Sequence, residues 1–140
     1  MTRQISKTGN IGIFDSGIGG VTVLKEIIKI LPNENYIYYS DSKNNPYGDK
    51  TNKEIIKICN KIVNKFINEC KAIVIACNTA SAKAAKNLRK KYNQKLEVLS
   101  ISRNDTRYRR EENEEKQNHC HAAGYSTACM WMSADIKSNR

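Results

Sequence analysis

The sequence predicts an α/β protein built on a four-stranded parallel sheet with flanking helices. Short apolar runs rich in isoleucine, valine and tyrosine alternate with longer segments whose apolar residues recur with the period of a helix. Strand and helix alternate without interruption, which favours parallel strands joined by right-handed crossovers. The expected strands span residues 10–16, 35–40, 72–76 and 96–101, and the expected helices span 20–31, 52–70 and 80–92.

Each element has its own signal in the sequence. NIGIFDS is an apolar run followed by glycines that suit a tight turn into GVTVLKEIIKIL, and NYIYYS is the next strand-like run. In the segment 52–70 the apolar residues keep a helical spacing. They stand at positions 55, 58, 59, 62, 63, 66 and 67. AIVIA is short and wholly apolar, ASAKAAKNLRKKY is rich in alanine, and LEVLSI ends the regular pattern.

The composition changes abruptly after residue 101. Residues 1–101 contain sixteen isoleucines and residues 102–140 contain one. Lys outnumbers Arg by fifteen to two before the change, and Arg outnumbers Lys by five to two after it. The last segment has no sustained period and little apolar surface to bury. We therefore expect an N-terminal extension (1–9), an α/β domain (10–101) and an irregular tail (102–140), for which disorder or out-of-frame translation would each account.

Bulk composition narrows the classes of function. The formal charge is +10, but the lysines before residue 100 are spread along helix-like segments without interleaved aromatic residues, so we expect no nucleic-acid partner. No apolar run approaches the length of a membrane span, and the first ten residues lack the apolar core of a signal peptide. We therefore expect a cytoplasmic protein with no membrane partner. Five cysteines without CxxC spacing indicate reduced thiols.

Polar or glycine-rich segments follow three of the predicted strands, where parallel α/β sheets bind their ligands. These segments are DSGIGG (15–20), SDSKNNPYGDKT (40–51) and CNTAS (77–81). DSGIGG suits an anion at a helix N-terminus, although the dinucleotide fingerprint fails at Thr22. The alternative is a plain turn in which Asp15 or Ser16 caps the helix. NNPYG is weaker evidence alone, because Asn-Pro starts many turns and a tyrosine beside it usually packs.

Cys77 is the most informative residue of these segments. It follows a buried strand directly and precedes a helix that we expect to begin near Thr79, so the helix dipole favours its thiolate. Asn78 and Thr79 add hydrogen-bond donors. Cys59 and Cys70 lie within or at the end of an amphipathic helix, where we expect them only to pack. No histidine precedes residue 119, so the regular part holds no Cys-His hydrolase pair, and the remaining groups suit the movement of a proton.

The motifs IGIFDSGIGGVTVLKEI, PYGDKT and KAIVIACNTASA, in this order and spacing, resemble the N-terminal half of the bacterial glutamate racemases, which belong to the aspartate/glutamate racemase family. The resemblance runs from about Asn10 to Ile101. It departs from the family pattern at Ser40, where a glycine commonly precedes the aspartate. It implies the first domain of a two-domain fold, in which each domain supplies one cysteine to a single glutamate. One thiolate removes the α-proton, and the other thiol protonates the opposite face.

On this resemblance, Cys77 is expected to be one catalytic acid/base, and six residues are expected to bind the substrate. The substrate-binding residues would be Asp15, Ser16, Tyr47, Gly48, Asn78 and Thr79. The aspartate would lie near the thiol and the substrate amine, the Asn-Thr pair would hold the α-carboxylate, and the Tyr-Gly pair would line the other wall. The substrate would be glutamate and the product D-glutamate for peptidoglycan, with no cofactor and no metal.

The resemblance leaves several alternatives open. The second cysteine of the family lies in a Gly-Cys-Thr-His-type motif, which neither NHCHAAG around Cys120 nor STACMWM around Cys129 reproduces. The short HCH cluster is expected to be incidental rather than a metal site. The chain could therefore be a non-catalytic fragment with at most weak carboxylate binding, or a racemase of another acidic amino acid. A homodimer is one assembly that remains open, and a small basic binding protein rests on net charge alone.

Overall fold

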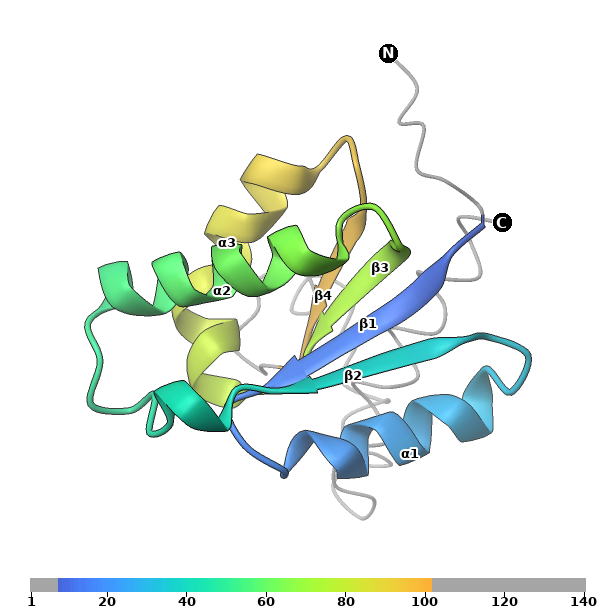
Figure 1. Cartoon of the computed structure of the whole chain (residues 1–140), viewed down its shortest axis with the longest axis horizontal. Helices are drawn as coiled ribbons and strands as arrows, with labels where there is room; N and C mark the ends of the chain where they lie inside the picture. The colour runs from blue at the N-terminus through green and yellow to red at the C-terminus, as the bar shows by residue number, and fades with distance from the viewer. Residues whose placement is uncertain (1–7, 102–140) are drawn as a thin grey trace, which may run out of the picture.

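The computed structural model describes residues 8–101 and confirms the predicted four-stranded parallel sheet (Figure 1). The strands are β1 (Asn10–Asp15), β2 (Tyr36–Ser40), β3 (Cys70–Ile75) and β4 (Glu97–Ser100), in the order β2-β1-β3-β4. The predictions for the tail 102–140 and for residues 1–7 of the extension lie outside the described residues. The domain boundaries therefore stay predictions.

The register brings the carboxyl ends of the strands together. β1 lies between β2 and β3, with Asp15 opposite Ser40 and Phe14 opposite Ile75. The arrowheads of all four strands point the same way in Figure 1. The chain runs from β1 to β2 on one side and then crosses to β3 on the other side of β1, so the strand order reverses at this point. Such a point is where open α/β sheets bind ligands.

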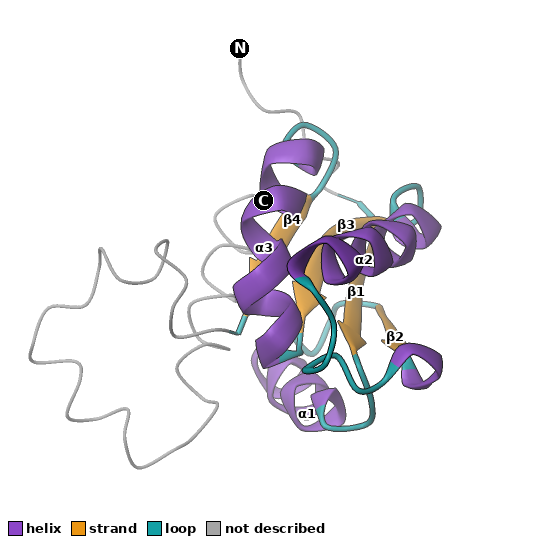
Figure 2. Ribbon diagram, turned by 90° about the vertical axis from the view of Figure 1, so that its left-hand side faces the viewer, coloured by secondary structure: helices purple, strands orange, loops and turns teal. Residues whose placement is uncertain are grey.

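The helices cover both faces of the sheet (Figures 1 and 2). They are α1 (Gly20–Ile30), α2 (Asn52–Phe66) and α3 (Asn78–Tyr92), with a short 3₁₀ helix, η1 (Ser42–Asn44), after β2. α1 packs Val23 and Ile27 against one face of the sheet. α2 and α3 pack together over the other face, and their buried residues join Phe14, Ile73 and Ile75.

Alternation along the strands explains why both faces are apolar. Successive side chains of a strand point to opposite faces, so the apolar runs supply both layers of the core. In β1, Ile11 and Ile13 face α1, and Phe14 faces α2 and α3. In β3, Val74 faces α1, and Ile75 faces the other layer. The wholly apolar strand-like runs in the sequence are therefore the strands of a sheet covered on both sides.

Three element boundaries differ from the sequence prediction by two residues or more. The helix expected over 52–70 ends at Phe66, and Cys70 is the first residue of β3 rather than the end of a helix. The Glu69 amide closes a turn onto the Phe66 carbonyl, and the Glu69 carbonyl accepts from the Asn10 amide, which starts the strand early. The helix expected from residue 80 begins at Asn78, because Cys77 caps it. η1 was not predicted.

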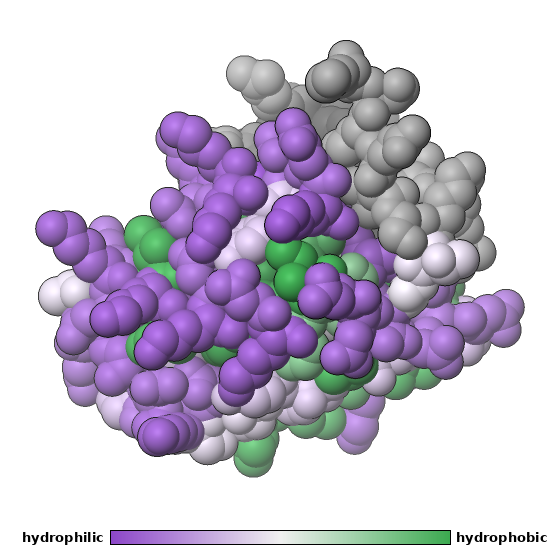
Figure 3. Space-filling model, turned by 45° about the horizontal axis from the view of Figure 1, so that its top comes forward, coloured by the Kyte–Doolittle hydropathy of each residue, from purple (hydrophilic) through white to green (hydrophobic). Residues whose placement is uncertain are grey.

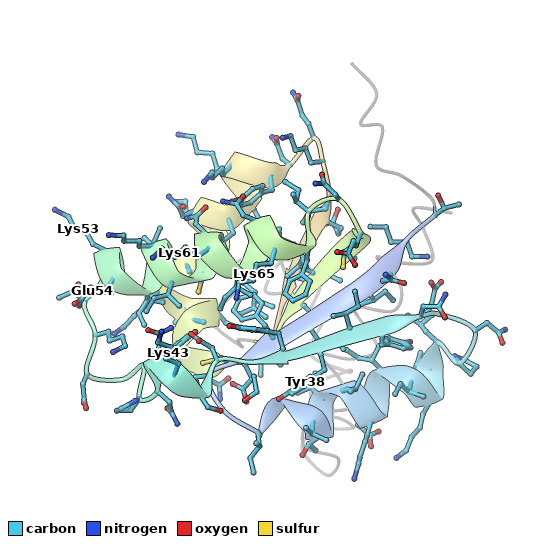
Figure 4. The ribbon with its side chains drawn as sticks, viewed as in Figure 1. Tyr38, Lys43, Lys53, Glu54, Lys61 and Lys65 are labelled. Atoms are coloured by element: carbon cyan, nitrogen blue, oxygen red, sulfur yellow. The ribbon has the colours of Figure 1, made fainter. Side chains whose placement is uncertain are left out.

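The outer surfaces of the helices are polar. Lys53, Lys61 and Lys65 project from α2 (Figure 4), and Lys65 Nζ lies 4.5 Å from the centre of the Tyr39 ring. Figure 3 shows a face that is largely hydrophilic, with small separate apolar patches. None of the helices within residues 8–101 has the length and apolar character that crossing a membrane would require.

Candidate functional site

Cys77 is the N-cap of α3 and lies at the carboxyl edge of the sheet. Its φ and ψ of −111° and 123° are extended, so the chain leaves β3 and enters the helix at this residue. The Ala80 amide donates to Cys77 Sγ at 3.5 Å, and the Ser81 amide donates to the Cys77 carbonyl at 2.8 Å. The first N–H groups of a helix have no acceptor within it, and the Cys77 sulfur accepts one of them, the Ala80 amide.

The turn after β1 brings a hydroxyl and a carboxylate to this thiol. Cys77 Sγ lies 3.6 Å from Ser16 Oγ, to which it can donate. Ser16 Oγ lies 3.5 Å from Asp15 Oδ1, and the Ser16 amide donates to the same oxygen at 2.7 Å. The contacts therefore run from Cys77 to Ser16 and from Ser16 to Asp15, so the serine hydroxyl links the thiol to the carboxylate.

Asp15 also binds the beginning of α1. The Gly20 amide donates to Asp15 Oδ2 at 2.6 Å, while the N-cap position is Gly19, which has no side chain. The negative charge expected at this helix N-terminus is thus the carboxylate of the chain itself. This is close to the plain-turn interpretation of DSGIGG. Asp15 is only 7% exposed. Its two carboxylate oxygens are held by the backbone amides of Ser16 and Gly20, one on each side of the turn.

Gly20 allows this close approach of α1 to the strand end, and its replacement should be costly. A Cβ at position 20 would lie 2.8 Å from Asp15 Cβ, 3.0 Å from Ala76 Cβ and 3.1 Å from the Tyr38 hydroxyl. None of these atoms can move without shifting the backbone or the ring. We expect Gly20→Ala to lower the free energy of unfolding in urea by about 1–3 kcal/mol.

The matched control for that substitution is Gly48→Ala. A Cβ at position 48 would meet nothing within 4 Å. This variant should unfold within about 0.5 kcal/mol of the parent chain, as surface changes usually do. Equal stability of the two variants would show that the packing of α1 against Asp15 tolerates a methyl group, contrary to the close contacts described above.

The loop after β2 is organised by Asp41, which the sequence analysis did not single out. Tyr47 donates its hydroxyl to Asp41 Oδ2 at 2.5 Å, and Asn44 Nδ2 donates to both carboxylate oxygens at 2.9 and 3.0 Å. The Asp41 amide donates to the Asp15 carbonyl at 2.8 Å, which ties this loop to β1. Burial and the bond to Asp41 raise the pKa of Tyr47, so its hydroxyl stays protonated.

The predicted site residues fall into a contacting group and a peripheral group. Asp15, Ser16 and Cys77 are linked by the contacts above, and Tyr47 packs in the same core cluster as Cys77. Gly48 and Asn78 are exposed and Thr79 is half-buried. Gly48 directly follows Tyr47, and Asn78 and Thr79 follow Cys77. The Tyr47 hydroxyl donates to Asp41 within the protein, and the place of Tyr47 in a wall of the substrate site stays a prediction.

The other described thiols, Cys59 and Cys70, are buried and have raised pKa values. Burial, with smaller effects of Cys77 and Asp41, raises the pKa of Cys59 to about 12. Burial and Glu69 raise the pKa of Cys70 to about 11. Cys70 lies at the opposite end of β3, beside Gly12. Within residues 8–101 there is no cluster of three His, Cys, Asp or Glu side chains that could hold a metal ion.

Comparison with known proteins gives a consistent result. The chain is 55% identical over 97 residues to a glutamate racemase of Fusobacterium nucleatum and 51% identical over 96 residues to one of Clostridium acetobutylicum. Over this part, the chain is similar to the glutamate racemases. The Francisella tularensis glutamate racemase, solved in complex with D-glutamate, matches with a TM-score of 0.62 and 40% identity over 68% of this chain. No family model matches the chain.

The similarity to glutamate racemases covers part of each protein. The alignments span 68% of this chain but only 36% of the Fusobacterium and 37% of the Clostridium enzyme. The chain therefore spans about a third of the length of the curated racemases that it matches. An Escherichia coli glutamate racemase, solved with L-glutamate and the activator UDP-MurNAc-ala, matches over 87% of this chain and 51% of its own, with 28% identity and a TM-score of 0.62.

Proposed function

We propose that Cys77 is an acid/base of a glutamate racemase reaction and that this chain supplies one side of the glutamate site. The observation that carries this proposal is the position of the Cys77 thiol. It lies at the carboxyl edge of the sheet, at the N-terminus of α3, and within 3.6 Å of the Ser16 hydroxyl. The relationship to the glutamate racemases supports glutamate as the ligand.

The proposed chemistry follows from the weak acidity of an amino-acid α-carbon. The Cys77 thiolate takes the α-proton, and the electron pair left on the α-carbon spreads into the substrate carboxylate. A second acid then protonates the opposite face. The carbanion needs a base in contact and donors on the carboxylate. The amides of Asn78 and Thr79, at the start of α3, have no acceptor within the helix and suit that carboxylate.

The remaining predicted residues have roles that fit the same site. Ser16 and Asp15, which the contacts above link to the thiol, would lie near the substrate amine. Gly48 is exposed and would present its backbone to the substrate, while Tyr47 is held by Asp41 and would support that wall. The product would be D-glutamate for peptidoglycan, made in the cytoplasm, and a homodimer is one assembly in which the reaction would occur.

A glutamate titration followed by ¹⁵N–¹H NMR tests the proposed site. We expect D- and L-glutamate to shift the amide signals of Ser16, Gly48 and Thr79, and to leave the opposite end of the sheet near Cys70 unchanged. γ-Aminobutyrate is the matched control compound, because it lacks the α-carboxylate and should not produce these shifts. The Cys77→Ser variant should still bind, since the donors for the carboxylate remain. No shift at the carboxyl edge up to the solubility of glutamate, or equal shifts with γ-aminobutyrate, would contradict the proposal.

A further inference from the structure

We propose that Ser40 is a positioning residue that, together with Tyr38, fixes the turn carrying Ser16 and so holds the Ser16 hydroxyl against Cys77. The inference deepens the proposed function, since it concerns the same thiol. Its test needs no glutamate. Ser40 is also the residue that departs from the family pattern in the sequence. The glycine that is common at that position has no hydroxyl to donate, so this contact depends on the serine.

The contacts converge on a single carbonyl. Ser40 Oγ donates to the Gly17 carbonyl at 2.7 Å, and the Tyr38 hydroxyl donates to the same oxygen at 3.1 Å. Tyr38 and Ser40 stand two residues apart on β2, so both side chains lie on the same face of the strand. Figure 4 shows Tyr38 on the side of β2 where α1 lies. Ser42 Oγ, 2.9 Å from Ser40 Oγ, adds a further polar contact to the serine.

Apolar packing gives the turn little support at this point. A Cβ at Gly17 would meet only Asn45 Nδ2, at 3.7 Å, and the next residue, Ile18, is 80% exposed. Apolar packing therefore does not hold residues 17 and 18 in place. On the other side of Ser16, Asp15 Oδ1 accepts the Ser16 amide at 2.7 Å. Ser16 is thus fixed from one side by Asp15 and from the other by the two hydroxyls on Gly17.

The consequence concerns the thiolate of Cys77. When Cys77 is deprotonated, the Ser16 hydroxyl can turn and donate to the sulfur, and a hydrogen bond to a charged group is stronger than one between neutral groups. The 3.6 Å separation between Ser16 Oγ and Cys77 Sγ depends on the path of the turn. Removing the Ser40 hydroxyl leaves only the longer bond from Tyr38, which allows the turn and its hydroxyl to move away from the sulfur.

Alkylation of Cys77 in the full 140-residue chain tests the inference. The rate with limiting iodoacetamide at one pH is followed by mass spectrometry of the peptide that contains Cys77. We expect Ser40→Ala to slow this reaction by about three- to fivefold, and Ser16→Ala by about tenfold, as for loss of a bond to a charged group. Ser40→Thr keeps the hydroxyl and suits a strand, so it should restore most of the rate. Thr22→Ala, which removes an exposed hydroxyl on α1, is the control and should react like the parent chain.

A double-mutant cycle separates positioning from a general loss of stability. If Ser40 acts through Ser16, Ser40→Ala should have little further effect on the Cys77 rate in the Ser16→Ala background. Thermal unfolding of each variant is recorded alongside. Tyr38→Phe, which removes the other donor, gives a second measurement if Ser40→Ala folds poorly. A parent-like rate in Ser40→Ala, or the same fold-loss with and without Ser16, would overturn the inference.

Discussion

The purified 140-residue chain is expected to produce no measurable D-glutamate from L-glutamate. Inversion at a carbon needs a base on one face and an acid on the other, and the described residues place one thiol, Cys77, at the carboxyl edge of the sheet. A general acid or base contributes about a hundred- to ten-thousandfold in rate, so lacking one partner removes most of the catalysis. The measurement is a circular dichroism or coupled-enzyme assay of glutamate inversion.

The control for that assay is Cys77→Ser, which should give the same background signal as the parent chain. The assay is repeated over a range of protein concentrations, because two copies in a homodimer could each present Cys77 to one substrate. Robust turnover that disappears in Cys77→Ser would contradict the expectation that the chain supplies only one side of the site.

Among the described thiols, Cys77 is expected to alkylate at least about a hundredfold faster than Cys59. Cys59 is fully buried, and its pKa of about 12 leaves almost no thiolate near neutral pH. Cys70, whose pKa is raised to about 11, should also react slowly. Cys77 combines a small exposed fraction with the donors at the start of α3. Peptide mapping after limiting iodoacetamide measures all three rates in one sample.

Denatured chain is the reference for this comparison, since all three thiols should then react at similar rates. Because thiolate is the reacting form, labelling of Cys59 and Cys70 should rise steeply above about pH 9, toward their raised pKa values. Equal labelling of the three cysteines in the native chain at neutral pH would mean that Cys77 has no special reactivity.

The fold was predictable because local patterns and topology rules agreed. Alternating helical and strand-like periods led to a parallel sheet, and the edge where Asp15 and Cys77 meet follows from the rule that parallel strands end on one side. The error at Cys70 arose because Ile67 continues the apolar helical spacing, and neither glycine nor proline marks the turn at residues 67–69. The strand begins there because the Glu69 carbonyl pairs with Asn10, a contact far away in sequence.

The finer geometry of the site could not be read from local patterns. The bond from Tyr47 to Asp41 depends on how a loop folds back, and the bonds to the Gly17 carbonyl depend on the register of β2 against β1. Asp41 did carry a signal, because it directly follows β2, just as Asp15 is the last residue of β1. Its role as the organiser of its loop became visible only from its partners.

The most direct test of the central claim is whether glutamate protects Cys77 from alkylation. The Cys77 rate is measured with limiting iodoacetamide at increasing concentrations of D- or L-glutamate, with γ-aminobutyrate as the matched compound and Cys59 and Cys70 as internal references. If Cys77 faces the α-carbon of bound glutamate, its rate should fall several-fold with glutamate and stay unchanged with γ-aminobutyrate, while the buried thiols do not respond. A Cys77 rate that is independent of glutamate at concentrations that shift the NMR signals of the carboxyl edge would contradict the assignment of Cys77 as the acid/base.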